Sequence, residues 1–92
     1  MRRAAKVDGN QSEIVSALRR VGCRVRDTSR LGAGFPDLVV RVPRAGGLIV
    51  LMEVKTKTGK LTKPQVEFFS DFPETVEVRS VDEALSAVGV RL

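Results

Sequence analysis

Two apolar segments joined by a short turn constrain the fold of this chain more than any other feature of its sequence. Residues 38–42 read Leu-Val-Val-Arg-Val, residues 48–54 read Leu-Ile-Val-Leu-Met-Glu-Val, and Pro-Arg-Ala-Gly-Gly lies between them. Runs of β-branched and apolar residues on either side of a turn with proline and glycine predict a β-hairpin. Because the second run is apolar at nearly every position, we expect it to be a central strand covered by helices on both faces of the sheet.

The segments around this hairpin carry helix and strand patterns. Apolar residues recur at helical spacing after Asn10, and in a second helix, which begins at Thr62, we expect Val66, Phe69 and Phe72 to face the core. The element order is then αβββαβα, so we predict the α/β class with a small mixed sheet flanked by helices. The predicted elements outside the hairpin are a helix over 10–22, a strand over 23–28, a helix from residue 62, a strand over 75–79 and a helix over 80–89.

Length and composition limit the domain organisation and the chemistry. The 92 residues provide for one small core, so we expect a single domain over residues 10–92 after a flexible basic N-terminus over residues 1–9. The absence of histidine excludes His-ligated zinc, Ser-His-Asp and Cys-His sites, which leaves carboxylates, amines or a metal. The single Cys23 and the lack of an apolar run of ~20 residues predict a cytoplasmic protein that spans no membrane.

Basic residues are concentrated in the first two thirds of the chain. Residues 1–62 hold 13 basic and 5 acidic side chains, whereas residues 63–92 hold 3 and 6. This distribution favours a polyanionic partner such as nucleic acid, although a solvated basic face explains it as well. With 4 Phe and no Trp or Tyr, recognition of duplex or branched DNA by backbone and shape fits better than stacking on single strands. The candidate phosphate contacts are Lys57, Lys60, Lys63, Arg24, Arg26 and Arg30.

Two acidic residues lie at matching positions on either side of the hairpin turn. Asp37 precedes the first strand and Glu53 ends the second, each eight residues from Ala45, so strand pairing brings them to the same edge of the sheet. Neighbouring carboxylates repel each other unless a cation lies between them. A ligand set of oxygens without histidine favours Mg²⁺ or Mn²⁺. Lys55 projects from the same strand face as Glu53, because side chains alternate along a strand.

Such a site suits the hydrolysis of a phosphodiester bond. A bound divalent ion lowers the pKa of a water ligand and polarises the phosphate. An ammonium group beside the ion aligns that water and offsets the charge that grows on the phosphate. We therefore expect Asp37 and Glu53 to be the metal ligands, and Lys55 the catalytic amine, of an enzyme that cleaves nucleic acid.

The same residues form a pattern that resembles a known family. Gly34-x-Pro36-Asp37, Glu53-x-Lys55 and Gly59-Lys60-Leu61-x-x-x-Gln65 together resemble the PD-(D/E)xK nuclease superfamily, specifically its virus-type replication-repair nuclease (VRR-Nuc) branch. The resemblance covers roughly residues 10–88 and implies a restriction-endonuclease-like core. It also implies a divalent ion held by Asp37, Glu53 and the Val54 backbone carbonyl, with Glu13 and Gln65 supporting the ion or its water. Stand-alone members resemble dimeric phage or prokaryotic nucleases that act on branched DNA such as four-way junctions, so it further implies a homodimer.

Each of these residues also fits a purely structural role. Asp37 fits a turn cap after Pro36, and Glu53 with Lys55 fits a surface ion pair. Glu13 and Gln65 each follow a capping residue by three positions, as in a helix capping box. At the level of function, the alternatives are a noncatalytic nucleic-acid-binding module on the same fold and a small assembly protein whose basic surface meets an acidic partner.

Overall fold

The computed structural model describes residues 9–91 of the chain, and its element order confirms the predicted αβββαβα arrangement. The expected flexible N-terminus over residues 1–9 falls outside the described residues except for Gly9. Among the described residues, no helix is long and apolar enough to cross a membrane. Two short 3-10 turns, η1 (Ser29–Leu31) and η2 (Pro43–Ala45), join the strands. The main elements are α1 (Gln11–Arg20), β1 (Arg24–Asp27), β2 (Leu38–Val42), β3 (Leu48–Val54), α2 (Lys63–Asp71), β4 (Val76–Val78) and α3 (Val81–Ala87).

The four strands form one mixed sheet in the order β1-β2-β3-β4. The first two pairings are antiparallel, and β3 pairs with β4 in parallel. The predicted hairpin is present, with Val40 opposite Val50 and Leu38 opposite Met52. β3 is therefore a central strand, as its apolar sequence predicted.

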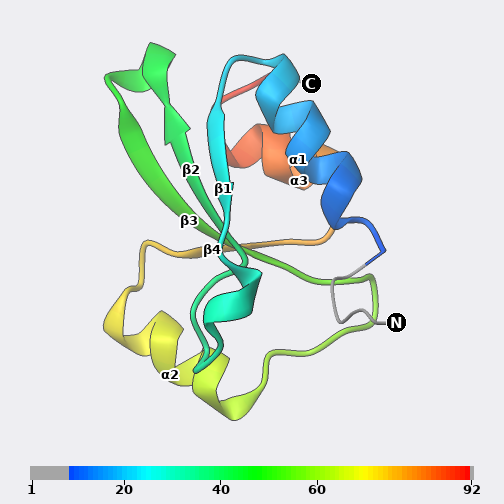
Figure 1. Cartoon of the computed structure of the whole chain (residues 1–92), viewed down its shortest axis with the longest axis vertical. Coiled ribbons are helices and arrows are strands. Elements are labelled where there is room, and N and C mark those ends of the chain that lie inside the picture. The colour runs from blue at the N-terminus through cyan, green and yellow to red at the C-terminus, as the bar shows by residue number, and fades with distance from the viewer. Residues whose placement is uncertain (1–8, 92) are drawn as a thin grey trace.

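The main core lies between one face of the sheet and the helices α1 and α3, which lie on the same side of the sheet (Figure 1). Ile14 and Leu18 of α1 are fully buried and share the core with Val40 and Met52 of the central strands. The helical spacing of the apolar residues in α1 predicted this buried face. Strand alternation places Leu38, Val40 and Val42 on the same sheet face, while Val39 and Arg41 face the other way.

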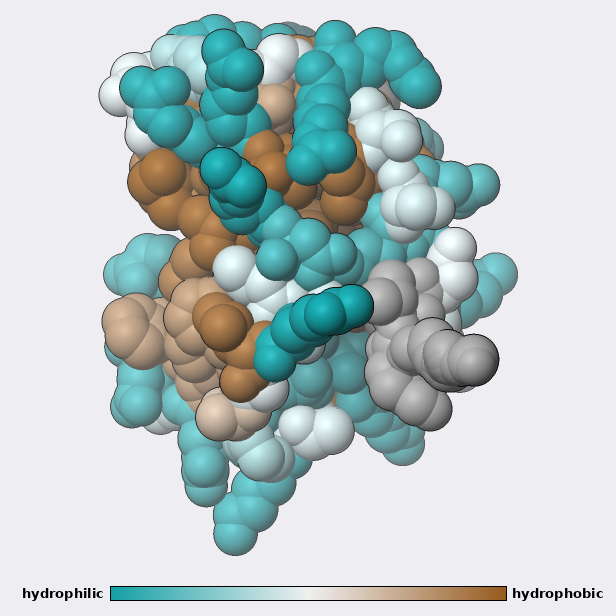
Figure 2. Space-filling model, in the orientation of Figure 1, coloured by the Kyte–Doolittle hydropathy of each residue, from teal (hydrophilic) through white to brown (hydrophobic). Residues whose placement is uncertain are grey.

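The expectation that helices cover both faces of β3 is met at the end of the strand, where Gln65 of α2 reaches Glu53 on the face away from α1 and α3, but not along the rest of that face. Ile49 projects from that face and is exposed, and Figure 2 shows apolar surface on the side away from α1 and α3. Helix α2 lies beyond the ends of the strands (Figure 1), since the polar segment 55–62 carries the chain past the sheet before the helix begins. Apolar composition alone did not show which face would be covered.

The placement of α2 also corrects the prediction for its apolar residues. Val66 and Phe72 are 52% and 49% exposed, so they do not face the core, and Phe69 is only partly buried. Phe68 instead packs edge-on against Phe35 with ring centroids 5.2 Å apart, and its ring stacks on Phe72 at 4.6 Å. Helix α2 is thus held by a small aromatic cluster, because helical spacing shows which residues share a face but not what that face meets.

The difference between the buried apolar residues of α1 and the exposed ones of α2 can be tested by measuring stability. Leu18→Ala leaves a cavity in the core and should lower the free energy of unfolding by about 2–5 kcal/mol, whereas Val66→Ala should change it by less than about 0.5 kcal/mol. Urea denaturation of both variants checks this difference. Equal losses in the two variants would show that α2 belongs to the core.

Candidate active site

Pairing of β2 with β3 brings Asp37 and Glu53 to the same end of the sheet. Leu38 lies opposite Met52 in the antiparallel pairing. Asp37, which precedes Leu38, and Glu53, which follows Met52, therefore face each other at the end of the ladder. The Val54 backbone N–H donates a hydrogen bond of 3.0 Å to Oδ2 of Asp37. The Asp37 carbonyl accepts from the Thr28 N–H at 2.7 Å, which extends the pairing with β1 beyond Asp27. The Asp37 side chain therefore ties the loop before β2 to the backbone of β3.

Glu53 is a buried carboxylate with two polar neighbours. Its side chain is 2% exposed, Nζ of Lys55 lies 3.7 Å from its Oε2, and the Gln65 amide nitrogen donates to the same oxygen at 3.0 Å. Lys55 is itself only 14% exposed. Burial of a charge is unfavourable unless it is paired and hydrogen-bonded, so this arrangement differs in kind from a solvated surface ion pair.

Gln65 combines the two roles that its sequence position allowed. Its Oε1 accepts from the Thr62 N–H at 2.8 Å and its own N–H donates to Oγ1 of Thr62 at 3.4 Å, which completes the capping box at the start of α2. Because the amide oxygen is engaged in the cap, the amide NH₂ is directed at Glu53. The cap of a helix outside the core thus orients a donor toward the buried acid.

The Gly34-Phe35-Pro36 segment fixes α2 in this position. Gly34 has φ +82°, and a Cβ there would lie 2.3 Å from the carbonyl oxygen of Pro64, the residue before Gln65. The Phe35 ring packs on α2, as described above, and the Pro36 carbonyl accepts from the Thr28 hydroxyl at 2.7 Å. The loop before Asp37 therefore positions both the acid and the helix that carries Gln65.

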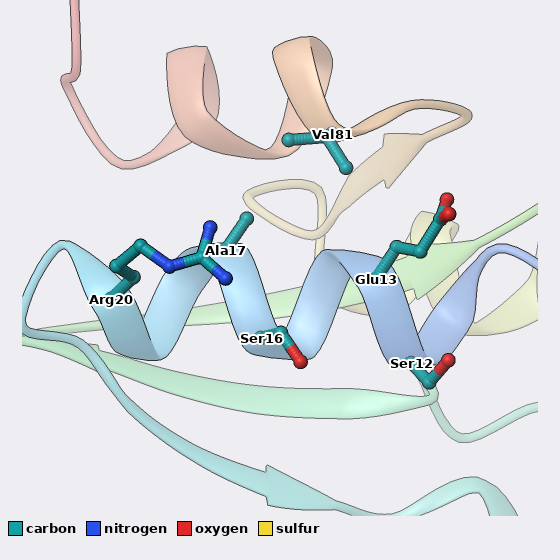
Figure 3. Close-up of a pocket in the computed structure, with 6 residues that line it drawn as sticks. All are labelled: Ser12, Glu13, Ser16, Ala17, Arg20 and Val81. Carbon is teal, nitrogen blue, oxygen red and sulfur yellow. The ribbon is translucent and has the colours of Figure 1, made fainter.

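Glu13 is not brought together with Asp37 and Glu53. It is exposed on α1 and lines a shallow pocket between α1 and α3 with Ser12, Ser16, Ala17, Arg20 and Val81 (Figure 3). Within residues 9–91, no group of three or more acidic, His or Cys side chains could hold a metal ion. The capping box suggested for Glu13 is also absent, since Asn10 makes no side-chain cap and its amide donates to the carbonyls of Lys55 and Arg79 at 3.2 Å each.

Gln11 is the polar residue of the first helix that faces the sheet, and the sequence interpretation missed it. It is buried, and its amide donates to Oδ2 of Asp27 at 3.1 Å. The signal was its spacing, because Gln11, Ile14 and Leu18 form one helical stripe. The family resemblance points to Glu13 instead, which lies two positions away and is exposed.

Asp27 is a second carboxylate with a dense set of donors. Partial burial raises its pKa, but hydrogen bonds from the hydroxyl and N–H of Ser29 and from Gln11, with the charge of Arg30, outweigh burial and lower the pKa of Asp27 overall. The Ser29 bonds to Oδ1 measure 2.6 and 2.9 Å. Asp27 is thus ionised near neutral pH and ties the end of β1 to α1.

The candidate phosphate contacts are all exposed and fall into two groups. Lys57, Lys60 and Lys63 lie on the segment between β3 and α2, and Arg30 lies in η1, at the same end of the molecule as Asp37 and Glu53 (Figure 1). Arg24 and Arg26 lie along β1, with Arg24 opposite Arg41, nearer the other end of the sheet.

Comparisons with known proteins agree with the motif pattern. Residues 4–83 match the family model for the VRR-NUC domain. A solved structure described as a VRR_NUC domain is similar to this chain, with 28% sequence identity and a TM-score of 0.65, over 89% of this chain and 92% of that one. Among the curated proteins, none matches the chain.

A substitution at Gly34 tests how α2 is positioned. Gly34→Ala introduces a Cβ that collides with the Pro64 carbonyl, whereas at Gly46, with φ +71° and ψ +17°, a Cβ meets nothing within 4 Å. Both variants carry the strain of a positive φ, about 1–2 kcal/mol, so the collision should make Gly34→Ala less stable than Gly46→Ala by about 1–3 kcal/mol. Urea unfolding measures both, and equal stability of the two would contradict the close approach.

The pKa of Asp27 predicts a pH dependence of stability. A pKa lowered by folding contributes stability above the unfolded value of about 3.9, and this contribution is lost as the pH falls through the folded pKa. Asp27→Asn should therefore be less stable than the wild type at pH 7. The difference in stability should shrink as the pH falls below the unfolded pKa of about 3.9 and through the lower folded pKa. Chemical denaturation at several pH values checks this, and a constant difference would contradict the assignment.

Proposed function

This chain belongs to the VRR-NUC domain family, a family of nuclease type, and from that premise we propose that it is a divalent-metal-dependent endonuclease that hydrolyses DNA phosphodiester bonds. The observation that supports this proposal most strongly is the burial of Glu53 beside Lys55 and Gln65, one residue from the Val54 N–H that binds Asp37. A structural strand end has no need for two acids and an amine in one place.

The donor set at this end of the sheet fits a hard cation. Its side-chain oxygens come from two carboxylates, and the chain has no histidine that would favour a softer metal. In the proposal, Asp37, Glu53 and the Val54 carbonyl hold Mg²⁺ or Mn²⁺. When bound, this ion supplies an activated water and electrostatic stabilisation of the phosphate.

The protein's own groups orient these ligands. The Val54 N–H fixes one oxygen of Asp37, and the Gln65 amide with the Lys55 ammonium fixes one oxygen of Glu53. Lys55 is the group placed to offset charge on a phosphate, since its ammonium lies on the same strand face as Glu53 and remains partly exposed. Gln65 is a positioning residue in this scheme, and we assign no role in it to Glu13.

Size and charge support the substrate and the assembly that we propose. We propose that Lys57, Lys60, Lys63 and Arg30 contact the phosphates around the cleaved bond without reading sequence. The described chain measures only 34 × 31 × 22 Å, and symmetric cleavage of a branched substrate needs two sites. A homodimer acting on branched DNA such as four-way junctions meets both requirements.

Cleavage assays on duplex, flap and four-way junction DNA test the proposal. With Mg²⁺ or Mn²⁺ present, Glu53→Gln and Lys55→Ala should each lower the cleavage rate by at least about 100-fold, because each removes a charged group at the reacting phosphate. Binding of uncleaved DNA should remain largely intact.

Glu67→Gln is the matched control, since Glu67 is an exposed carboxylate on α2, two residues after Gln65. It should cleave at the wild-type rate. Wild-type cleavage by Glu53→Gln would refute the site, and DNA binding without any cleavage by the wild type would favour the noncatalytic module.

A further inference from the structure

Four exposed arginines gather toward the end of the sheet that lies away from the candidate active site. Residues 14–26 and 38–52, which supply them, contain no Asp or Glu. The α1–β1 turn and the β2–β3 turn lie together at this end, opposite α2, and hydrophilic side chains crowd its surface (Figures 1 and 2). We call the following residues the arginine end: Arg19, Arg24, Arg41 and Arg44.

The fold places these side chains close to one another. Arg24 lies directly opposite Arg41 in the β1–β2 register, so both project from the same sheet face. The guanidinium of Arg41 extends over the hairpin turn, where a Cβ at Gly47 would lie 2.7 Å from its Nη2. From α1, Nη2 of Arg19 donates to the Val25 carbonyl at 3.0 Å, which holds this guanidinium at the edge of β1.

Arg44 belongs to the same cluster, because its charge acts on Cys23, which lies just before β1. Burial raises the pKa of the Cys23 thiol, and the positive charge of Arg44 opposes that rise. Cys23 immediately precedes Arg24, so the turn between β2 and β3 lies near the start of β1.

The two ion pairs seen within residues 9–91, Lys55 with Glu53 and Arg79 with Glu77, involve no arginine of this group. Like charges directly opposite each other on two strands are destabilising. The arrangement is therefore unfavourable for the free chain and favourable for a complex with an anion. All four residues are arginine, whose planar fork of donors suits phosphate oxygens.

We propose that the arginine end binds the phosphate backbone of the DNA substrate several base pairs from the bond that is cut. This inference rests on the proposed function for the identity of the polyanion. Asp37 and Arg41 project from the same face of β2, four residues and therefore about 13 Å apart. At ~3.4 Å per base pair, this distance corresponds to about four base pairs of duplex. The lysines beside the active site and the arginine end are thus two separate contacts on one DNA substrate.

Salt-dependent DNA binding tests this second contact. Fluorescence anisotropy of a labelled 20-base-pair duplex, measured without divalent metal so that no cleavage occurs, gives the affinity over a series of KCl concentrations. Arg41→Ala should reduce the slope of log affinity against log salt by about 0.9, and Arg24→Ala with Arg41→Ala by about 1.8, because each lost phosphate contact releases fewer counterions.

Arg20→Ala is the matched control for charge. Arg20 is also exposed, but it lines the pocket between α1 and α3 on the helix side of the sheet (Figure 3). This variant should keep the wild-type slope. Thermal unfolding of Arg24→Ala with Arg41→Ala should occur at or above the wild-type temperature, since the substitution removes a repulsive pair, so weaker binding will not reflect misfolding.

The outcomes separate this inference from the nuclease proposal. If the Arg41 variants keep the wild-type slope of log affinity against log salt, the arginine end does not bind DNA. The same conclusion follows if Arg20→Ala reduces the slope as much as Arg41→Ala does. Either result would hold even if the wild type cleaves DNA with Mg²⁺. A reduced slope in the Arg41 variants alone supports the arginine end, whether or not cleavage is observed.

Discussion

The register of the β2–β3 hairpin is the constraint on which the rest of this site depends. It faces Asp37 and Glu53 toward each other at the end of a ladder whose other residues, apart from Arg41, are apolar. A shift of one residue in this pairing would move every side chain to the opposite face of the sheet. The core under α1 and α3, which fixes Val40 and Met52, therefore also fixes the two acids.

Outside the core, the site is completed by a helix that contributes little to packing. Helix α2 is held by Phe35 and by the close approach of Gly34 to Pro64, and it presents Gln65 to Glu53. At the site this helix meets the sheet through Gln65, while Ile49, farther along the same face of β3, is exposed. An open face beside a buried carboxylate allows a bulky polyanion to reach the site, and a helix over that face would prevent it.

Much of the fold could be predicted from the sequence because its signals are local. The hairpin, the cap at Thr62 and the buried stripe of α1 each follow from spacing within one element. The exposure of Val66 and Phe72 could not, because a helical stripe does not reveal which surface it meets. The family resemblance pointed to Glu13 on the first helix, whereas the spacing with Ile14 and Leu18 marks Gln11 as the polar residue on the buried face. The arginine end could not be predicted from the sequence either, because Arg24 and Arg41 are distant in sequence and meet only through strand pairing.

Calorimetric titration with Mn²⁺ in the absence of DNA tests the central claim, that the hairpin assembles a cation site from Asp37 and Glu53, most directly. The account predicts measurable binding by the wild type and its loss in Asp37→Asn, with the variant still folded by circular dichroism. Equal binding by the wild type and the folded variant, or no binding by either, would contradict it.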